Sequence, residues 1–387
     1  MELGTFMISR IKYGLIAAVF LALFSCKQED DPVPIPAGAT PYIIEVPFGF
    51  PQKMNIPANN PMTVEGVELG RYLFYDGRLS GRTHPDSLMS CATCHRQERA
   101  FECGIDHPQF TDGRPHGLGG QETPHVMLPL VNLVWNGNGY LWNGWVSNDN
   151  SVESMRRLED IVWMTVVDPH EIAGDTSRTK ALIASIPGYR EMFKAAFGSE
   201  TVTMERINMA VAQFVRTLIS ANSKFDRYMR GEEQLSASEL NGFVLFTTEE
   251  GADCFHCHGG FGNPLFTTNL FYNNGKDTLF PGLDDRFAIT GDPMDQGAYK
   301  ATTLRNIELT GPYMHDGRYP TLEDVIEFYA HGLLWSPYID PLMHHIANGG
   351  TQLTPTEKTD LIAFIRTLRD EDFLTNPAFG PPASLPE

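Results

Sequence analysis

The pattern Cys91-Ala92-Thr93-Cys94-His95 constrains this chain most, because it returns as Cys254-Phe255-His256-Cys257-His258. Two thiols separated by two residues and followed directly by a histidine form the attachment signature of a c-type haem. The two sulfurs can reach the two vinyl groups of a porphyrin, and the next side chain can offer an imidazole nitrogen to the iron. The sequence therefore predicts two covalently bound haem c groups.

Cysteine pairs with this spacing also have other uses. One pair alone could be a redox dithiol, and two pairs could supply the four thiolates of a zinc site. Neither use needs a histidine directly after the second cysteine, and that histidine follows in both copies. The haem interpretation is therefore preferred, with His95 and His258 as iron ligands. The attachment points would be Cys91, Cys94, Cys254 and Cys257.

Length and charge limit what such a chain can do. At 387 residues it is long for a single core, so two domains with one haem each are expected. The formal net charge of -19 argues against a nucleic-acid partner and against an anionic membrane surface. The charge suits a small neutral substrate. It also suits a basic partner protein, which the negative electrostatic field of this chain would attract.

Residues 1–26 are predicted to be a lipoprotein-type signal peptide. Arg10 and Lys12 precede an apolar run, residues 15–24, that is too short to span a bilayer. The run ends in Leu-Phe-Ser-Cys, which resembles a bacterial lipobox whose cysteine, here Cys26, is lipidated. The expected location is therefore periplasmic, with a lipid anchor at Cys26 as the means of membrane attachment.

Helical periodicity dominates the chain beyond residue 60. Each haem motif follows a helix that ends in Leu-Phe and a polar turn, which is a weak internal repeat. Strand signals are sparse, so the predicted fold class is mainly α with long connecting loops. The expected helices cover residues 64–74, 153–167, 204–228, 235–246 and 354–368.

The expected domain organisation follows from this pattern. Residues 27–60, rich in proline and acidic residues, would form a tether and an extended arm. Residues 61–230 would form a cytochrome c-like domain around the first haem, and residues 231–387 a second such domain around the second haem. The glycine-rich stretches 106–150 and 259–300 are expected to be loops.

Further motifs give the chain a family resemblance. From about Thr63 to Leu368 it resembles the bacterial di-haem cytochrome c peroxidases and their MauG-like relatives. The matching segments, in chain order, are VELGRYLFYDGRLS, SCATCH, YLWNG, DPHEIAG, RTLISANSKFDRYMRGE, CFHCH, LRNIELTGPYMHDGRYPTLEDVIEFY and TPTEKTDLIAFIRTL.

The resemblance implies roles for three residues of the first half. His95 would be the proximal ligand of the haem that reacts with peroxide. Glu171, in the segment DPHEI, matches a glutamate over the open face of that haem, where a carboxylate can move protons. Trp142, in LWNG, matches a tryptophan that relays electrons between the haems, and Trp145 is a near competitor for that role.

The resemblance leaves the outer ligand of the second haem open. Aligning the segment TLEDVIE places Tyr329 where most peroxidases of the family have a methionine and where MauG has a tyrosine. Met314 is the competing candidate. A thioether ligand would raise the potential of this haem, whereas an oxygen ligand would favour oxidised iron.

The sequence departs from the family pattern at two other features. Many of these peroxidases carry a histidine that blocks the first haem until the second is reduced, and neither His107, His116 nor His125 stands in a matching context. The segment FTDGR at residues 110–114 looks more like the MauG-like branch, which lacks that ligand.

A calcium ion between the haems is the second feature. It would be held partly by backbone near Thr310 and Pro312. The position of the family's asparagine ligand falls at about Val126 here, and valine cannot supply that side-chain ligand. Calcium is therefore an additional cofactor that the resemblance allows but does not require.

The resemblance implies an oxidoreductase. The first expectation is a peroxidase that reduces hydrogen peroxide to water at the first haem, with electrons passed from a small c-type cytochrome or similar donor through the second haem. One alternative is a MauG-like oxidase acting on a protein or organic substrate. The other is a dihaem electron-transfer cytochrome without catalysis. Many family members are dimers, so a homodimer is a further expectation.

Overall fold

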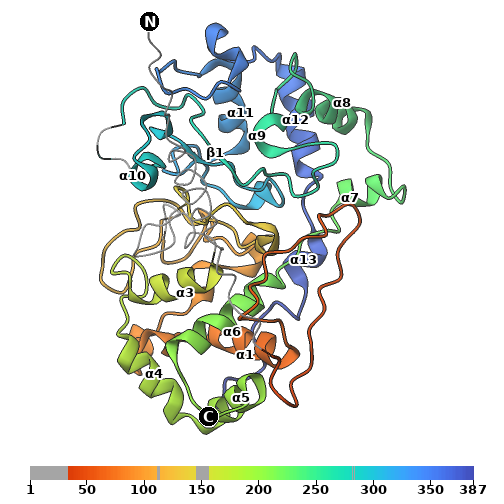
Figure 1. Cartoon of the computed structure of the whole chain (residues 1–387). Helices are drawn as coiled ribbons and strands as arrows, with labels where there is room; N and C mark the ends of the chain where they lie inside the picture. Colours follow the sequence, from red (N-terminus) through yellow and green to blue (C-terminus); the bar gives the residue numbers. More distant parts are fainter. Residues whose placement is uncertain (1–33, 111–113, 145–156, 281, 283) are drawn as a thin grey trace, which may run out of the picture.

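The computed structural model describes residues 34–110, 114–144, 157–280, 282 and 284–387 (Figure 1). The expected signal peptide with Cys26, and Trp145, lie outside the described residues. Within them the secondary structure is mainly helical, as predicted, and the strands pair as one antiparallel ribbon, β1 (Phe271–Tyr272) with β2 (Tyr299–Lys300). Among the described helices, none combines the length and the apolar character needed to cross a membrane.

The first half of the chain occupies the lower part of Figure 1. The helix expected at residues 64–74 is present as α1, and α3 is the described part of the one expected at 153–167. The helices of this half are α1 (Val64–Tyr75), α2 (Cys91–Cys94), α3 (Leu158–Val167), α4 (Thr176–Ser185), α5 (Pro187–Phe197) and α6 (Met204–Arg216).

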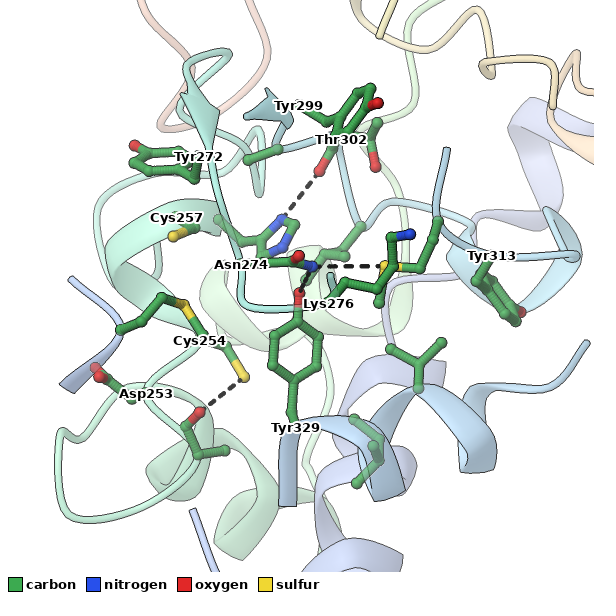
Figure 2. A pocket seen from close by; sticks show the side chains of 18 of the residues that line it. Asp253, Cys254, Cys257, Tyr272, Asn274, Lys276, Tyr299, Thr302, Tyr313 and Tyr329 are labelled. Atoms are coloured by element: carbon green, nitrogen blue, oxygen red, sulfur yellow. Dashed lines mark hydrogen bonds between the residues drawn. The ribbon is translucent and has the colours of Figure 1, made fainter. Parts of the chain in front are cut away.

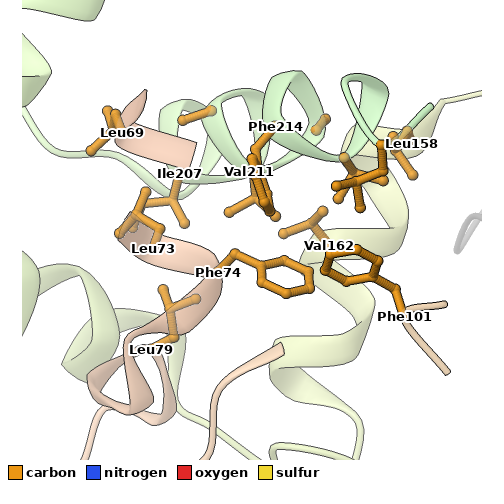
Figure 3. Close-up of a cluster of buried hydrophobic side chains, with 14 of the residues drawn as sticks. Leu69, Leu73, Phe74, Leu79, Phe101, Leu158, Val162, Ile207, Val211 and Phe214 are labelled. Carbon is orange, nitrogen blue, oxygen red and sulfur yellow. The ribbon is translucent and has the colours of Figure 1, made fainter. Parts of the chain in front are cut away.

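The core of this half lies where α1, α3 and α6 meet (Figure 3). Leu73 and Phe74 of α1 and Phe214 of α6 are each at most 1% exposed. The two helices touch along Gly70, where an added Cβ would lie 1.9 Å from the Ala210 carbonyl oxygen. The rings of Phe74 and His95 lie 6.5 Å apart, so this core also supports the first haem motif.

The second half repeats the arrangement in the upper part of Figure 1. There α8 packs on α12, and an added Cβ at Gly242 would lie 2.0 Å from the Asp360 carbonyl oxygen. The capping box predicted at Thr354 and Glu357 opens α12. The helices of this half are α8 (Ala237–Phe246), α9 (Phe255–His258), α10 (Phe287–Thr290), α11 (Leu322–His331) and α12 (Pro355–Arg366).

The single helix expected over residues 204–228 is wrong, because the structure has two helices there. α6 ends at Arg216 and α7 (Lys224–Met229) begins after a break. In the break, the Asp370 carboxylate accepts hydrogen bonds from the Ser220 hydroxyl and from the backbone N–H groups of the next two residues. A carboxylate distant in sequence therefore satisfies backbone groups that a helix would otherwise pair.

Both ends of the described chain pack against the first half. Phe50, within the segment expected to be an arm, is 4% exposed and its ring lies 4.9 Å from that of Trp135. After α13 (Glu371–Thr375), the Arg71 guanidinium donates hydrogen bonds to backbone carbonyls between residues 377 and 381. The last residues of the chain thus pack on the half where the described chain begins. The predicted boundary between two domains at residue 230 stays a prediction.

Candidate functional site

The first Cys-x-x-Cys-His motif forms α2 and ends on His95. His95 Nδ1 lies 2.6 Å from the Phe101 carbonyl oxygen. A carbonyl can only accept, so Nδ1 carries the proton and Nε2 keeps its lone pair. Burial lowers the pKa of His95 to about 4, so the ring is neutral at pH 7. A neutral imidazole oriented through its second nitrogen is the form in which histidine binds iron.

The second motif reproduces this arrangement on α9. His258 Nδ1 lies 3.0 Å from the Thr302 carbonyl oxygen, and burial lowers the pKa of His258 to about 4. His95 lines one cavity, whereas His258 lines a second, together with the thiols of Cys254 and Cys257. Both motifs therefore present a free imidazole nitrogen to a cavity, which fits one haem each.

The positions of the motif cysteines argue against a shared zinc ion. Among the described residues, the groups whose ligand atoms lie close enough to hold one metal ion include none of the four motif cysteines. The donor set thus fits two porphyrins and not one four-thiolate site.

Glu171 lies in the cavity of the first motif, in the loop that follows α3. Its backbone N–H donates to the Asp168 carbonyl at 3.1 Å, and its own carbonyl accepts from Leu118 at 2.9 Å. The carboxyl is partly buried and lines the same mostly apolar cavity as His95. Burial, and then the nearby charge of Asp168, raise its pKa to about 7, against a hydrogen bond from Thr165 that lowers it. A carboxyl with this pKa can both accept and donate protons near neutral pH.

Trp142 lies between the two cavities and lines both. Its indole Nε1 donates to the Val126 carbonyl at 2.8 Å, and its backbone carbonyl accepts from the Lys300 N–H at 2.8 Å. Lys300 and Thr302 also line both cavities. Trp142 is therefore held through both its side chain and its backbone at the position where the cavities adjoin.

The two candidate outer ligands of the second haem come together in the second cavity. Tyr329, on α11, and Met314 both line this cavity beside Asn274, and Figure 2 shows the Tyr329 hydroxyl pointing toward the Asn274 amide. Its Nδ2 donates to the Tyr329 hydroxyl at 2.9 Å and to the Met314 sulfur at 3.7 Å. Met314 has a left-handed backbone, with φ of 67°. The structure thus brings both candidate ligands to the same side of the second cavity.

The three histidines considered as blocking ligands lie in different surroundings. His107 is buried, with Nε2 at 2.9 Å from the Thr93 carbonyl, and it lies outside the lining of the first cavity. His116 is exposed. His125 lines that cavity, but its Nε2 faces the Asp284 carbonyl at 3.2 Å and its Nδ1 faces His315 at 3.3 Å.

One of the positions expected around a calcium ion, Val126, lies at the junction of the cavities beside Trp142. Val126 lines the first cavity, and its carbonyl is taken by the Trp142 indole. Its side chain offers no oxygen, and Thr310 is buried with its hydroxyl donating to the Ile307 carbonyl at 3.2 Å. Calcium binding stays a prediction that the resemblance allows but does not require.

Three residues that line the cavities were not predicted from the sequence. Asn274 and Lys300 lie in a stretch that was expected to be loop, and their position depends on contacts between distant segments. His170 precedes Glu171, lines the same cavity and has its Nδ1 at 2.9 Å from the Asp168 carboxylate. The adjacency of His170 to Glu171 was the one signal in the sequence for any of the three.

The chain is similar to several known proteins. Residues 64–234 match the family described as di-haem cytochrome c peroxidase. The methylamine utilization protein MauG of Methylorubrum extorquens is 32% identical over 329 residues, 84% of each chain. The cytochrome c551 peroxidase of Nitrosomonas europaea is 34% identical over 277 residues, covering 70% of this chain and 75% of that protein.

A solved structure has the same fold. The crystal structure of a MauG-like protein associated with microbial copper homeostasis superposes with a TM-score of 0.76 at 32% identity, covering 89% of this chain and 100% of that one. The two motifs, their separate cavities and this fold define a dihaem c-type protein. The chain belongs to the di-haem cytochrome c peroxidase and MauG family.

Proposed function

We propose that this protein is a di-haem peroxidase that reduces hydrogen peroxide to water with electrons from a small c-type cytochrome or similar donor. The observation that carries the proposal is the partly buried Glu171 carboxyl, with a pKa of about 7, in the same cavity as the neutral His95. Each turnover consumes one peroxide, two electrons and two protons and forms two water molecules. When bound, haem c supplies the iron that exchanges the electrons.

The residues of the first cavity would bind peroxide and move its protons. Glu171 would accept a proton from bound peroxide and return it to the oxygen that leaves as water. A positioned acid–base group contributes ~10²–10⁴ in rate. Thr165 lies close enough to lower the pKa of this carboxyl, and the cavity around it is lined mostly by apolar side chains. His95, held through the Phe101 carbonyl, would be the proximal iron ligand.

Other residues would serve electron supply. Trp142, which lies between the cavities, would relay electrons from the second haem to the first. His258 would be the proximal ligand of the second haem, and Tyr329 is the outer ligand that we propose, with Met314 as the competitor. The four motif cysteines would hold the two haems covalently. The protein would be exported to the periplasm and anchored through Cys26, where its electron donor also acts.

A MauG-like oxidase is the second candidate function. The observation that favours it is the Tyr329 hydroxyl in the second cavity, since an oxygen ligand would favour oxidised iron in the second haem. In that case peroxide would serve as the oxidant of a protein or organic substrate. The 32% identity to MauG is compatible with either activity.

Steady-state turnover tests the proposal. The holoprotein, with both haems verified, is mixed with hydrogen peroxide and a reduced small c-type cytochrome, with and without pre-reduction of the enzyme. We expect rapid oxidation of the donor that depends on peroxide. A fully loaded protein that leaves the cytochrome reduced would contradict the peroxidase proposal. A requirement for pre-reduction would point to a blocking ligand, and His125 is the described histidine to test first.

A further inference from the structure

A group of imidazoles and carboxylates stands at the rim of the second cavity and has no part in the proposed reaction. Asp253 lies at its centre, with a side chain that is 6% exposed. One carboxylate oxygen of Asp253 lies 2.6 Å from His256 Nδ1, and the other lies 3.2 Å from His344 Nδ1. His256 precedes Cys257 in the second motif, and His344 comes from a distant turn of the chain.

The buried carboxylate sets the chemistry of both rings. Because a carboxylate accepts, each Nδ1 donates its proton to Asp253, and each Nε2 keeps a free lone pair in the neutral ring. The ring centroids lie 5.0 Å apart with planes at 87°. This is the arrangement in which an outer carboxylate orients histidine ligands around a metal ion.

A third ligand completes the group. Glu249 Oε1 lies 3.6 Å from His256 Nε2, the nitrogen that Asp253 leaves free. One ligand atom each from Glu249, His256 and His344 lies within 4.8 Å of the others. The Glu249 and His344 side chains are 59% and 41% exposed, so an ion could reach the group from solvent.

The charge balance also favours a cation. In the described part of the chain, the ion pairs of Glu249 and Asp253 are with histidines and not with lysine or arginine. A second cluster of similar composition shows the contrast. Asp277 and Asp316, beside His315, are both neutralised by Lys276 and Arg318, so that cluster has no need of a metal.

We propose that Glu249, His256 and His344 bind one divalent transition-metal ion, with Zn²⁺ as the best match. Two imidazoles and one carboxylate suit zinc, and the exposed side leaves a fourth position for water. Asp253 does not touch the ion and instead holds both rings. The site would place a positive charge beside the attachment loop of the second haem, since Asp253 and His344 also line that cavity.

The test uses the holoprotein after removal of adventitious metal by a chelator. Zn²⁺ alone is titrated calorimetrically, and Cu²⁺ serves as a second probe whose electron paramagnetic resonance spectrum reports bound nitrogens. We expect one ion per chain and a copper signal with coupling to two imidazole nitrogens. The His344→Ala variant should lose at least about tenfold in affinity, and Asp253→Asn roughly 10–100-fold.

His84→Ala is the matched control. His84 is an exposed histidine of the first half whose ion pair is with Asp86, so its loss should leave binding within about twofold. Haem content of every variant is checked by absorbance. Absence of stoichiometric binding overturns the proposal, as does equal affinity in His344→Ala. An equal loss of affinity in His84→Ala overturns it too. Peroxide turnover does not enter the test, so its outcome is independent of the proposed function.

Discussion

At the scale of single residues, Glu171 decides whether the first cavity can do acid–base chemistry. Its pKa is about 7, raised first by burial and then by the charge of Asp168. Peroxide must give up a proton, and only the ionised carboxylate can accept it. We expect kcat/KM for peroxide to be level above pH 7 and to fall about tenfold per pH unit below it.

Two substitutions check this assignment. Glu171→Gln should slow peroxide turnover by roughly tenfold or more and remove the inflexion near pH 7. Asp168→Asn removes the like charge, so the inflexion should move to lower pH while turnover persists. The measurement is the pH profile of donor oxidation, with haem content as control. An unchanged rate in Glu171→Gln would take this residue out of the mechanism.

The second cavity poses a choice between two residues that share one hydrogen-bond donor, Asn274. If Tyr329 is the outer ligand, Tyr329→Phe should change the optical spectrum of the second haem and raise its reduction potential. Met314→Leu, the matched control, should leave both unchanged. The measurement is a spectroelectrochemical titration of each variant. A reversed pattern would make Met314 the ligand and would favour the peroxidase over the MauG-like function.

At the scale of secondary-structure elements, each half depends on a helix pair that touches along a glycine. In α1 that residue is Gly70, whose Cβ position is occupied by the Ala210 carbonyl at 1.9 Å. Gly70→Ala should push α1 and α6 apart and cost ~1–3 kcal/mol in the free energy of unfolding. Gly137→Ala is the control, since a Cβ there would meet nothing within 4 Å. Denaturant unfolding of both variants measures the difference, and an equal stability would refute the close contact.

At the scale of the whole molecule, the two halves are joined by hydrogen bonds on Asp370. This residue is 1% exposed, and its carboxylate accepts from Ser220 and from the backbone of the break between α6 and α7. Asp370→Ala should therefore cost ~2–5 kcal/mol, because hydrogen bonds to a charged group are lost and buried donors are left unpaired. Asp372→Ala removes one exposed contact, to Asn222, and should change stability by less than about 0.5 kcal/mol. Equal effects of the two substitutions would contradict this account.

Some of these features were readable from the sequence because they depend on neighbouring residues. The two haem motifs are local patterns, and so is the capping box at Thr354. Helical periodicity placed α1, α8 and α12, since their apolar faces repeat every three to four residues. The family resemblance supplied Glu171, Trp142 and Tyr329 as candidates.

Tertiary structure decided the features that depend on residues distant in sequence. Periodicity alone favoured one helix over residues 204–228, and the break appeared only because Asp370 supplies acceptors from about 150 residues away. The same holds for the Asn274 amide between Tyr329 and Met314, and for Asp253 between two histidines from separate segments. The sequence by itself determined the two haem motifs and predicted the cysteines and histidines that hold the haems. Only the folded chain decided which groups surround them, because such contacts form when packing brings distant segments together.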